Sequence, residues 1–426
     1  MSAGAISLIV VMVVGLFAGV PIAWALIIAS ASAIVIEGIP IAVLVQRLFT
    51  SMDAFTMLAV PCFLVAGDIM SKGSISRRLV EFANSFFGTL RGGLGVVAIM
   101  SATVFASLTG SSIATTAAIG GIMCPEMTAK NYPREFSAAV VAMGGTLGPI
   151  IPPSVIFIFY AQASELSIVR LFLSSVFPGL IASFSMIAWI LYIAKKRNYP
   201  KEGSISLKKI LVSTKGAVFA LIMPLIILGG IYLGVFTATE SAAVAVMYGI
   251  VVSMILYRDV GIKDMFNMFK GTARTIANLM VLIAAANLFG YLIGYFNIPR
   301  ILTATVMKYA PNTFWFMLLC GIMLTIAGMF VESLALTVIA APILHPMALS
   351  YGVDPIHFAC FAVFLMNLGM ATPPFAPLAF IASDIAEVPV LKVFREVIPY
   401  IILQLGVAVL IAMIPSLSTW LPSTMR

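Results

Sequence analysis

Apolar runs of about 20 residues recur along the whole chain, and short polar or charged segments separate them. A helix of that length crosses the hydrocarbon core of a bilayer, which is about 30 Å thick. The first run, from Ala3 to Ile36, is too long for one crossing, and Pro21 would remove a helix hydrogen bond, so we divide the run in two. The pattern also predicts a polar loop around Glu37, Arg47 and Asp53 and an interfacial helix at 75–90. The predicted spans lie near 4–18, 22–36, 54–71, 171–194, 216–235, 237–257, 275–295 and 397–415.

Two further apolar stretches are interrupted differently. Short arms at 93–108 and 112–127 meet at a Thr-Gly-Ser-Ser tip, and each arm is marginal as a full crossing. Basic residues flank both outer ends, so we predict a re-entrant hairpin over 93–127 whose tip stops inside the membrane. Residues 136–163 are predicted to form one span that glycines and prolines break in its middle.

The second half of the chain repeats the first. Adding 221 to each residue number superimposes the hairpin and the broken helix on a second copy without a gap: Gly148 falls on Gly369, and Pro153 falls on Pro374. The chain is therefore an internal duplication. We predict a first repeat at 1–194, a linker at 195–215 and a second repeat at 216–426, with the second hairpin at 313–346 and the second broken helix at 357–385.

The composition places the chain in the membrane. Hydrophobic residues make up 62% of the 426 and charged residues only 9%, which excludes an ordinary soluble domain. The net charge of +8 does not require nucleic acid as a partner, because lysine and arginine collect in cytoplasmic loops of membrane proteins.

The charge distribution also predicts orientation. With a periplasmic N-terminus, cytoplasmic segments carry 19 of the 24 lysines and arginines, all except Arg47, Arg170, Arg300, Lys308 and Arg426. The linker is then cytoplasmic, and the two hairpins enter from opposite sides. Each half has five crossings plus a hairpin, so we predict an all-α polytopic membrane protein built as an inverted repeat.

The hairpin tips and helix breaks are the candidate functional sites. Broken helices free backbone carbonyls, which can hold a sodium ion, and half-helix N-termini, which can hold a carboxylate. We expect each tip to face the break of its own half. In the first half, the tip residues Ser107, Gly110, Ser111 and Ser112 would face Gly145, Gly148 and Ile151 at the break. In the second half, Gly328, Glu332 and Ser333 would face Asn367, Gly369, Ala371 and Thr372.

Acidic residues in apolar segments are costly and usually serve a cavity or a partner. Of these, Glu332 at the second tip is the best functional candidate. Asp68 is interpreted as structural or interfacial. Glu240 and Asp384 are interpreted as helix caps or buried hydrogen-bond partners. His345 and His357 are interpreted as structural. No nucleotide-binding glycine loop or HExxH motif occurs, so we predict neither an enzyme nor an ATP-driven pump.

Four segments in combination resemble a known family, the large membrane subunit of TRAP (tripartite ATP-independent periplasmic) transporters of the DctM or SiaM type. They are GSSIATTAAIG at 110–120, GGTLGPIIPPS at 144–154, GVFTATESAAVAV at 234–246 and ATPPFAPLAF at 371–380. The resemblance extends over essentially the whole chain. It implies an ion-transporter-superfamily fold of elevator type, with a scaffold domain and a moving transport domain that holds both hairpins.

The resemblance also implies what is bound. A sodium gradient would drive uptake of an organic acid, sialic acid or a four-carbon dicarboxylate, across the bacterial inner membrane, with no organic cofactor. Sodium sites would map onto Ser107, Gly110, Gly145 and Gly148 and onto Gly328, Gly369 and Thr372. The substrate would lie near Ser111, Ser112, Ser154, Glu332 and Asn367.

The partners implied are a small four-helix membrane subunit, expected as a separate polypeptide, and a periplasmic substrate-binding protein, besides membrane lipid. Two alternatives stay open at this point. The chain could be a single-component sodium-coupled dicarboxylate carrier, or a membrane scaffold subunit that transports nothing.

Overall fold

The computed structural model describes residues 1–53, 55–72, 74–201 and 206–425, and these residues form helices and no strand. The N-terminal helices are α1 (Ala3–Phe17), α2 (Ile22–Glu37), α3 (Ala42–Met52), α4 (Ala59–Lys72) and α5 (Ile75–Phe87), with a short 3-10 helix, η1 (Phe55–Leu58), before α4. After the linker come α12 (Leu207–Tyr232), α13 (Ala238–Ile250), the π-helical turn η2 (Val251–Leu256), α14 (Ile262–Tyr295) and α15 (Ile298–Val306). We call these elements the scaffold group.

The remaining helices form the hairpin group. Its first-half members are α6 (Gly93–Thr109), α7 (Ser112–Ala129), α8 (Arg134–Gly145), α9 (Val155–Ser164), α10 (Ile168–Ser174) and α11 (Val176–Lys196). Its second-half members are α16 (Thr313–Phe330), α17 (Ser333–Ser350), α18 (Pro355–Gly369), α19 (Pro377–Ala386), α20 (Val390–Met413) and α21 (Ser416–Ser423). The predicted hairpin arms and broken helices are therefore confirmed to within a few residues.

The duplication is visible in the helix boundaries. Adding 221 to α6, α7, α8 and α9 gives the positions of α16, α17, α18 and α19 within three residues at either end. The backbone repeats as well, because the Pro152-Pro153 and Pro373-Pro374 peptide bonds are both cis. The shared small residues and prolines thus specify the same hairpin and the same break twice.

Three sequence predictions need correction. The segment interpreted as a polar loop contains the amphipathic helix α3, in which Gln46, Arg47 and Thr50 lie on one helix face. The span predicted from 275 begins at Ile262, because the charged residues before it form the first turns of α14 instead of a loop. The span predicted at 171–194 is two helices, α10 and α11, which meet at Ser175. Residues 202–205 of the predicted linker lie outside the described residues.

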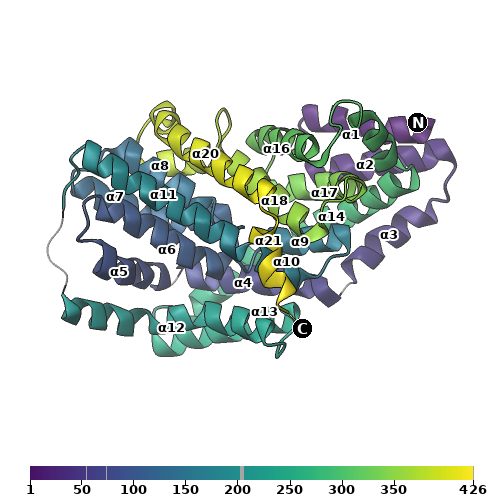
Figure 1. Ribbon diagram of the computed structural model, residues 1–426. Coiled ribbons are helices and arrows are strands. Elements are labelled where there is room, and N and C mark those ends of the chain that lie inside the picture. Colours follow the sequence, from purple (N-terminus) through teal and green to yellow (C-terminus); the bar gives the residue numbers. More distant parts are fainter. Residues whose placement is uncertain (54, 73, 202–205, 426) are drawn as a thin grey trace.

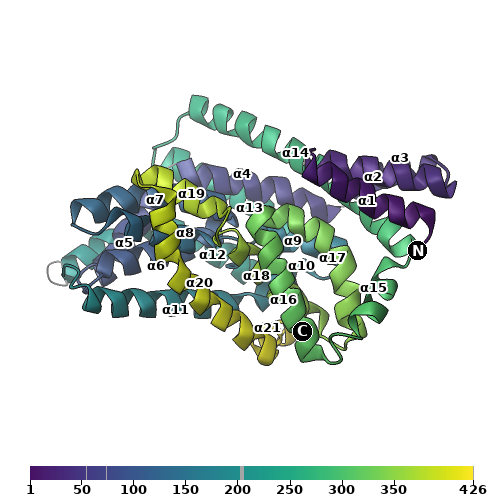
Figure 2. The same ribbon diagram turned by 90° about the horizontal axis from the view of Figure 1, so that it is seen from above.

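The scaffold group borders the hairpin group on more than one side: in Figure 1 α12 and α13 run below it and α1, α2 and α3 lie at its right, and Figure 2 shows α14 beside α1, α2 and α3 along one edge. In the scaffold group α2 and α3 lie along α14, α4 packs on α13 and α14, and α5 packs on α12. In the hairpin group the halves interlock: α9 packs on α17 of the second hairpin, and α19 packs on α7 of the first. Each broken helix therefore crosses to the hairpin of the other half, which joins the two repeats into one body.

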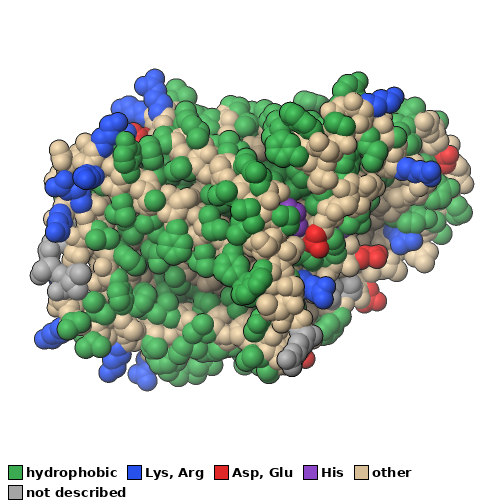
Figure 3. Space-filling view, viewed as in Figure 1, with side chains coloured by type: hydrophobic (Ala, Val, Ile, Leu, Met, Phe, Trp, Pro, Cys, Tyr) green, Lys and Arg blue, Asp and Glu red, His purple; other side chains and the backbone are tan. Residues whose placement is uncertain are grey.

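The surface is that of a membrane protein. Figure 3 shows a broad band of hydrophobic side chains with lysine and arginine gathered toward one end of the molecule and mixed charges at the other. Seven helical segments in the described part of the chain are long and apolar enough to cross a membrane: 168–196, 207–232, 238–256, 262–295, 313–330, 333–350 and 390–413. The chain is a multi-pass membrane protein.

Candidate functional site

The first tip and the first break are in direct contact. We define the first half-site as tip residues 109–112 with break residues 146–154. A methyl group placed on Gly148 would lie 2.5 Å from the carbonyl carbon of Ser111, and one on Gly110 would lie 2.6 Å from the carbonyl oxygen of Pro153. Gly110 has φ of +60°, a conformation that glycine adopts without strain. Only glycine lets the two backbones approach this closely.

The second tip and break meet in the same way. We define the second half-site as tip residues 328–333 with Gly369 at the end of α18 and break residues 370–376. A methyl group on Gly369 would lie 2.6 Å from Cα of Gly328, and the Ser333 hydroxyl donates to the carbonyl oxygen of Met366 at 3.2 Å. The expectation that each tip faces its own break agrees with the geometry in both halves.

Serine side chains cap both half-helices of the first half-site. Ser111 accepts from the backbone N–H of Ala114, and Ser154 accepts from that of Phe157, each at 3.4 Å. Such caps satisfy donors that a helix N-terminus otherwise leaves free. Ser154 is fully buried, so its hydroxyl belongs to the protein interior in this conformation.

The half-helices of the second half-site lack these caps. Neither Glu332 before α17 nor Ala376 before α19 makes a side-chain capping hydrogen bond. Glu332 is exposed, and so is the neighbouring Phe375, which packs on Phe330 with ring centroids 5.1 Å apart. Two helix N-termini with partial positive charge are thus left without serine or threonine caps beside an exposed carboxylate.

One predicted residue joins the two half-sites. Asn367, at the end of α18, is fully buried. Its Oδ1 accepts from the Ser112 hydroxyl at 2.6 Å, and its Nδ2 donates to the carbonyl oxygen of Thr146. The amide is therefore engaged on both sides by groups of the first half-site.

Two other predicted sodium residues, Ser107 and Thr372, make hydrogen bonds to carbonyl oxygens three or four residues earlier in the chain. Ser107 is buried and donates to the carbonyl oxygen of Val104 at 2.6 Å, and Thr372 is buried and donates to that of Leu368 at 2.8 Å. Gly145 packs so closely on Thr116 that a methyl group there would lie 1.8 Å from Thr116 Oγ1. The lone pairs of these hydroxyls remain as oxygen donors for a cation.

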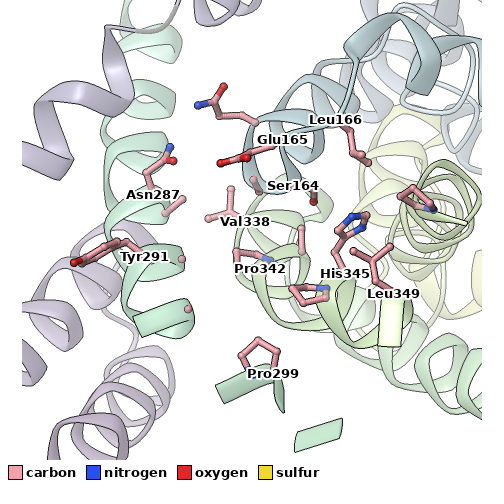
Figure 4. A pocket seen from close by; sticks show the side chains of 18 of the residues that line it. Ser164, Glu165, Leu166, Asn287, Tyr291, Pro299, Val338, Pro342, His345 and Leu349 are labelled. Atoms are coloured by element: carbon pink, nitrogen blue, oxygen red, sulfur yellow. The ribbon is translucent and has the colours of Figure 1, made fainter. Parts of the chain in front are cut away.

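A cavity of about 1130 Å³ lies at the boundary between the two helix groups. It lies between α14 and α15 on one side and α9 and α17 on the other, and Figure 4 shows Asn287 and Tyr291 across from Ser164 and Glu165. Arg47 and Arg300 line it, and the guanidinium of Arg47 stands 4.0 Å from the centre of the Tyr291 ring. Among the described residues that line it, none is a predicted sodium or substrate residue.

The remaining polar candidates have structural partners. Thr272 of α14 donates to Asp68 of α4, which fits the structural interpretation, and Glu240 forms a capping box with Thr237, which confirms the predicted cap. Asp384 is exposed, so it is not a buried partner. His345 bonds Tyr160 at 3.2 Å, and His357 bonds Ser418 at 2.8 Å.

Sequence reasoning missed three residues here. Thr146 supplies the carbonyl that Asn367 contacts, and the offset of 221 could have found it, since 146 and 367 are equivalent positions. Thr116 is fully buried beside Gly145, and its hydroxyl has no hydrogen-bond partner among the described residues. Gly67 of α4 touches the first tip, where a methyl group would lie 3.2 Å from Cα of Thr109, and no sequence pattern signals that contact.

Comparisons with known proteins agree with this architecture. The model of the family described as "Tripartite ATP-independent periplasmic transporter, DctM component" matches residues 9–417. The C4-dicarboxylate TRAP transporter large permease protein DctM of Pseudomonas aeruginosa is 37% identical over 377 residues, which cover 88% of each chain.

Two further relatives are named for other compounds. The isethionate TRAP transporter permease protein DctMQ of Oleidesulfovibrio alaskensis is 35% identical, over 94% of this chain and 64% of the relative. The sialic acid TRAP transporter large permease protein SiaM of Vibrio cholerae is 32% identical over 96% of each chain.

Among solved structures, the YdaH transporter of Alcanivorax borkumensis superimposes with a TM-score of 0.62 over 87% of this chain and 86% of that one. The sequences are 13% identical, so the similarity concerns the fold alone.

Proposed function

The chain belongs to the DctM family of tripartite ATP-independent periplasmic transporters, and we propose that it imports an organic acid together with sodium across the bacterial inner membrane. It is a large permease subunit and not an enzyme. The proposal concerns the coupling ion, the class of substrate, the movement of the hairpin group and the location in the inner membrane.

The observation that carries the proposal is the pairing of a hairpin tip with a helix break in both halves. Each pair places backbone oxygens and buried hydroxyls inside an apolar body, and such groups can replace the hydration shell of a sodium ion. We assign sodium to the two half-sites on this ground. Ser107, Gly110, Gly145 and Gly148 would serve the first ion, and Gly328, Gly369 and Thr372 the second.

The substrate is proposed to be an organic anion. The names of the relatives include C4-dicarboxylate, isethionate and sialic acid, which all carry a carboxylate or a sulfonate. The N-termini of α17 and α19, free of side-chain caps, can donate to either group. Sialic acid and a four-carbon dicarboxylate both remain candidates, with Ser111, Ser112, Ser154, Glu332 and Asn367 as the nearby polar groups.

We propose an elevator movement of the hairpin group against the scaffold group. The cavity between α14 and α9 leaves space for such a displacement. With the predicted orientation it opens toward the periplasm, where Arg47 and Arg300 would attract an anion. A small four-helix membrane subunit and a periplasmic binding protein would complete the transporter.

Reconstitution tests the proposal. In liposomes that contain this chain, its small subunit and its binding protein, uptake of labelled sialic acid or succinate should require an inward sodium gradient. Potassium in place of sodium should reduce uptake to background, and undiminished uptake in potassium would refute the coupling.

The same liposomes separate the alternatives. Uptake by this chain without the other two proteins would favour a single-component carrier. A chain that supports no uptake of any organic anion in any combination, although it is folded, would favour a scaffold subunit that transports nothing.

A further inference from the structure

Equivalent positions of the two repeats touch at one point. Thr146 and Asn367 are 221 residues apart, which is the offset of the duplication, and the Asn367 amide donates to the Thr146 carbonyl. This contact links the break of the first half to the last turn of α18 in the second.

The contact is not symmetric. The Thr146 hydroxyl donates to the carbonyl oxygen of Met143 in its own helix at 2.6 Å and does not reach across. Asn367 instead holds two elements of the first half at once: the tip through Ser112 and the break through Thr146. Its side chain is fully buried, so water does not compete for these bonds.

The same turn of α18 builds the second half-site. Its Met366 carbonyl accepts from Ser333 at the second tip, and Gly369 packs on Gly328. One helical turn, from Met366 to Gly369, therefore contacts both tips. A shift of this turn alters the distance between tip and break in both halves together.

We propose that Asn367 couples the two half-sites, so that a cation bound in one raises the affinity of the other. A cation in the first half-site would fix the Ser112 tip and the Thr146 break, and Asn367 would then hold α18 where Gly328 and Gly369 meet. Coupling between two sites is reciprocal and commonly changes affinity between about 5-fold and 150-fold. Asn367 acts through its neighbours, so it is a positioning residue. The inference rests on the proposed sodium binding.

Sodium-dependent stability tests the coupling without transport. The unfolding temperature of the purified chain is measured against sodium concentration, with potassium replacing sodium at constant ionic strength, because a bound ligand stabilises the folded state. The wild type should respond with a Hill coefficient above one. In Asn367→Ala the Hill coefficient should fall to one, and half-saturation should need about tenfold more sodium.

The control is Ser137→Ala in α8, outside both half-sites. It removes a buried hydroxyl that donates to the carbonyl oxygen of Pro133, one turn earlier in the chain, at 3.1 Å, and it leaves both bonds of Asn367 in place. The Hill coefficient of this variant should equal that of the wild type. If Asn367→Ala does not yield folded protein, Ser112→Ala removes one of the two bonds and should lower the Hill coefficient part of the way.

The outcomes separate two failures. A wild type that sodium does not stabilise more than potassium would overturn the proposed sodium binding itself. A wild type that sodium stabilises with a Hill coefficient of one, or an Asn367→Ala or Ser112→Ala variant with an unchanged response, would leave sodium binding intact and overturn the coupling.

Discussion

The two half-sites share a sequence motif and a backbone path, yet their surroundings differ. In the first, every break residue from 146 to 154 is buried, and serines cap both half-helices. In the second, Glu332, Pro374 and Phe375 are exposed, and neither half-helix has a side-chain cap. Duplicated sequences can therefore give one half-site whose break is buried and whose half-helices are capped, and another that has exposed residues and no side-chain cap.

Backbone strain also differs between the two half-sites. The first tip turns at Gly110, where a φ of +60° costs little. The second break contains Ala376 with a φ of +28°, which an alanine rarely adopts, and Ala376 is fully buried. Strain held by the surrounding packing is typical of functional sites, and it lies in the half-site that also has exposed residues.

The largest effect is expected where the half-sites are alike. Gly148→Val and Gly369→Val should each reduce sodium-driven uptake at least about 100-fold, because the added carbons would displace backbone atoms 2.5 to 2.6 Å away and separate tip from break. Gly121→Val is the control, since a methyl group there meets nothing within 4 Å. Uptake by liposomes measures all three, and normal uptake by either half-site variant would contradict the close contact.

Smaller effects on stability, of opposite sign in the two half-sites, should distinguish them. Ser154→Ala removes the cap of α9 and should destabilise the chain by about 1 kcal/mol. Ala376→Gly removes the strain before α19 and should stabilise it by about 1 kcal/mol. Thermal unfolding in detergent measures both, and shifts of the same sign would show that the two breaks do not differ in this way.

Effects of the same size or smaller are expected at the ion pairs that join the two repeats. Arg197 pairs with Glu396 through two bonds of 2.9 and 3.1 Å, and this contact raises the pKa of Arg197 above its ordinary value. Arg134 and Glu387 lie 3.5 Å apart and are largely exposed. Arg197→Ala should cost about 1 kcal/mol and Arg134→Ala less than about 0.5 kcal/mol.

The measurement is again thermal unfolding, repeated in 1 M salt. High salt screens exposed charges, so it should abolish the small effect of Arg134→Ala first. An Arg134→Ala variant that is less stable than Arg197→Ala would mean that the bidentate geometry does not set the order.

The sequence by itself determined the architecture of this protein. Apolar length gave the spans, and glycine and proline at recurring positions gave two hairpins and two broken helices, because helix breaks inside a membrane need those residues. The offset of 221 matched each hairpin and each helix break with its copy in the other half. The pattern did not predict α3, α15 and α21, the division between α10 and α11, or the first turns of α12 and α14. The polar and charged residues of short or amphipathic helices resemble those of loops.

Tertiary structure decided what the repeats do not share. Serine occurs throughout the first motif, but only the fold shows that Ser111 and Ser154 cap helices whereas Ser112 reaches Asn367. The cavity beside Arg47 and the contact of Gly67 with the first tip join segments far apart in the chain. Burial and side-chain direction depend on which helix lies opposite, and a sequence repeat fixes the local backbone without fixing its neighbours.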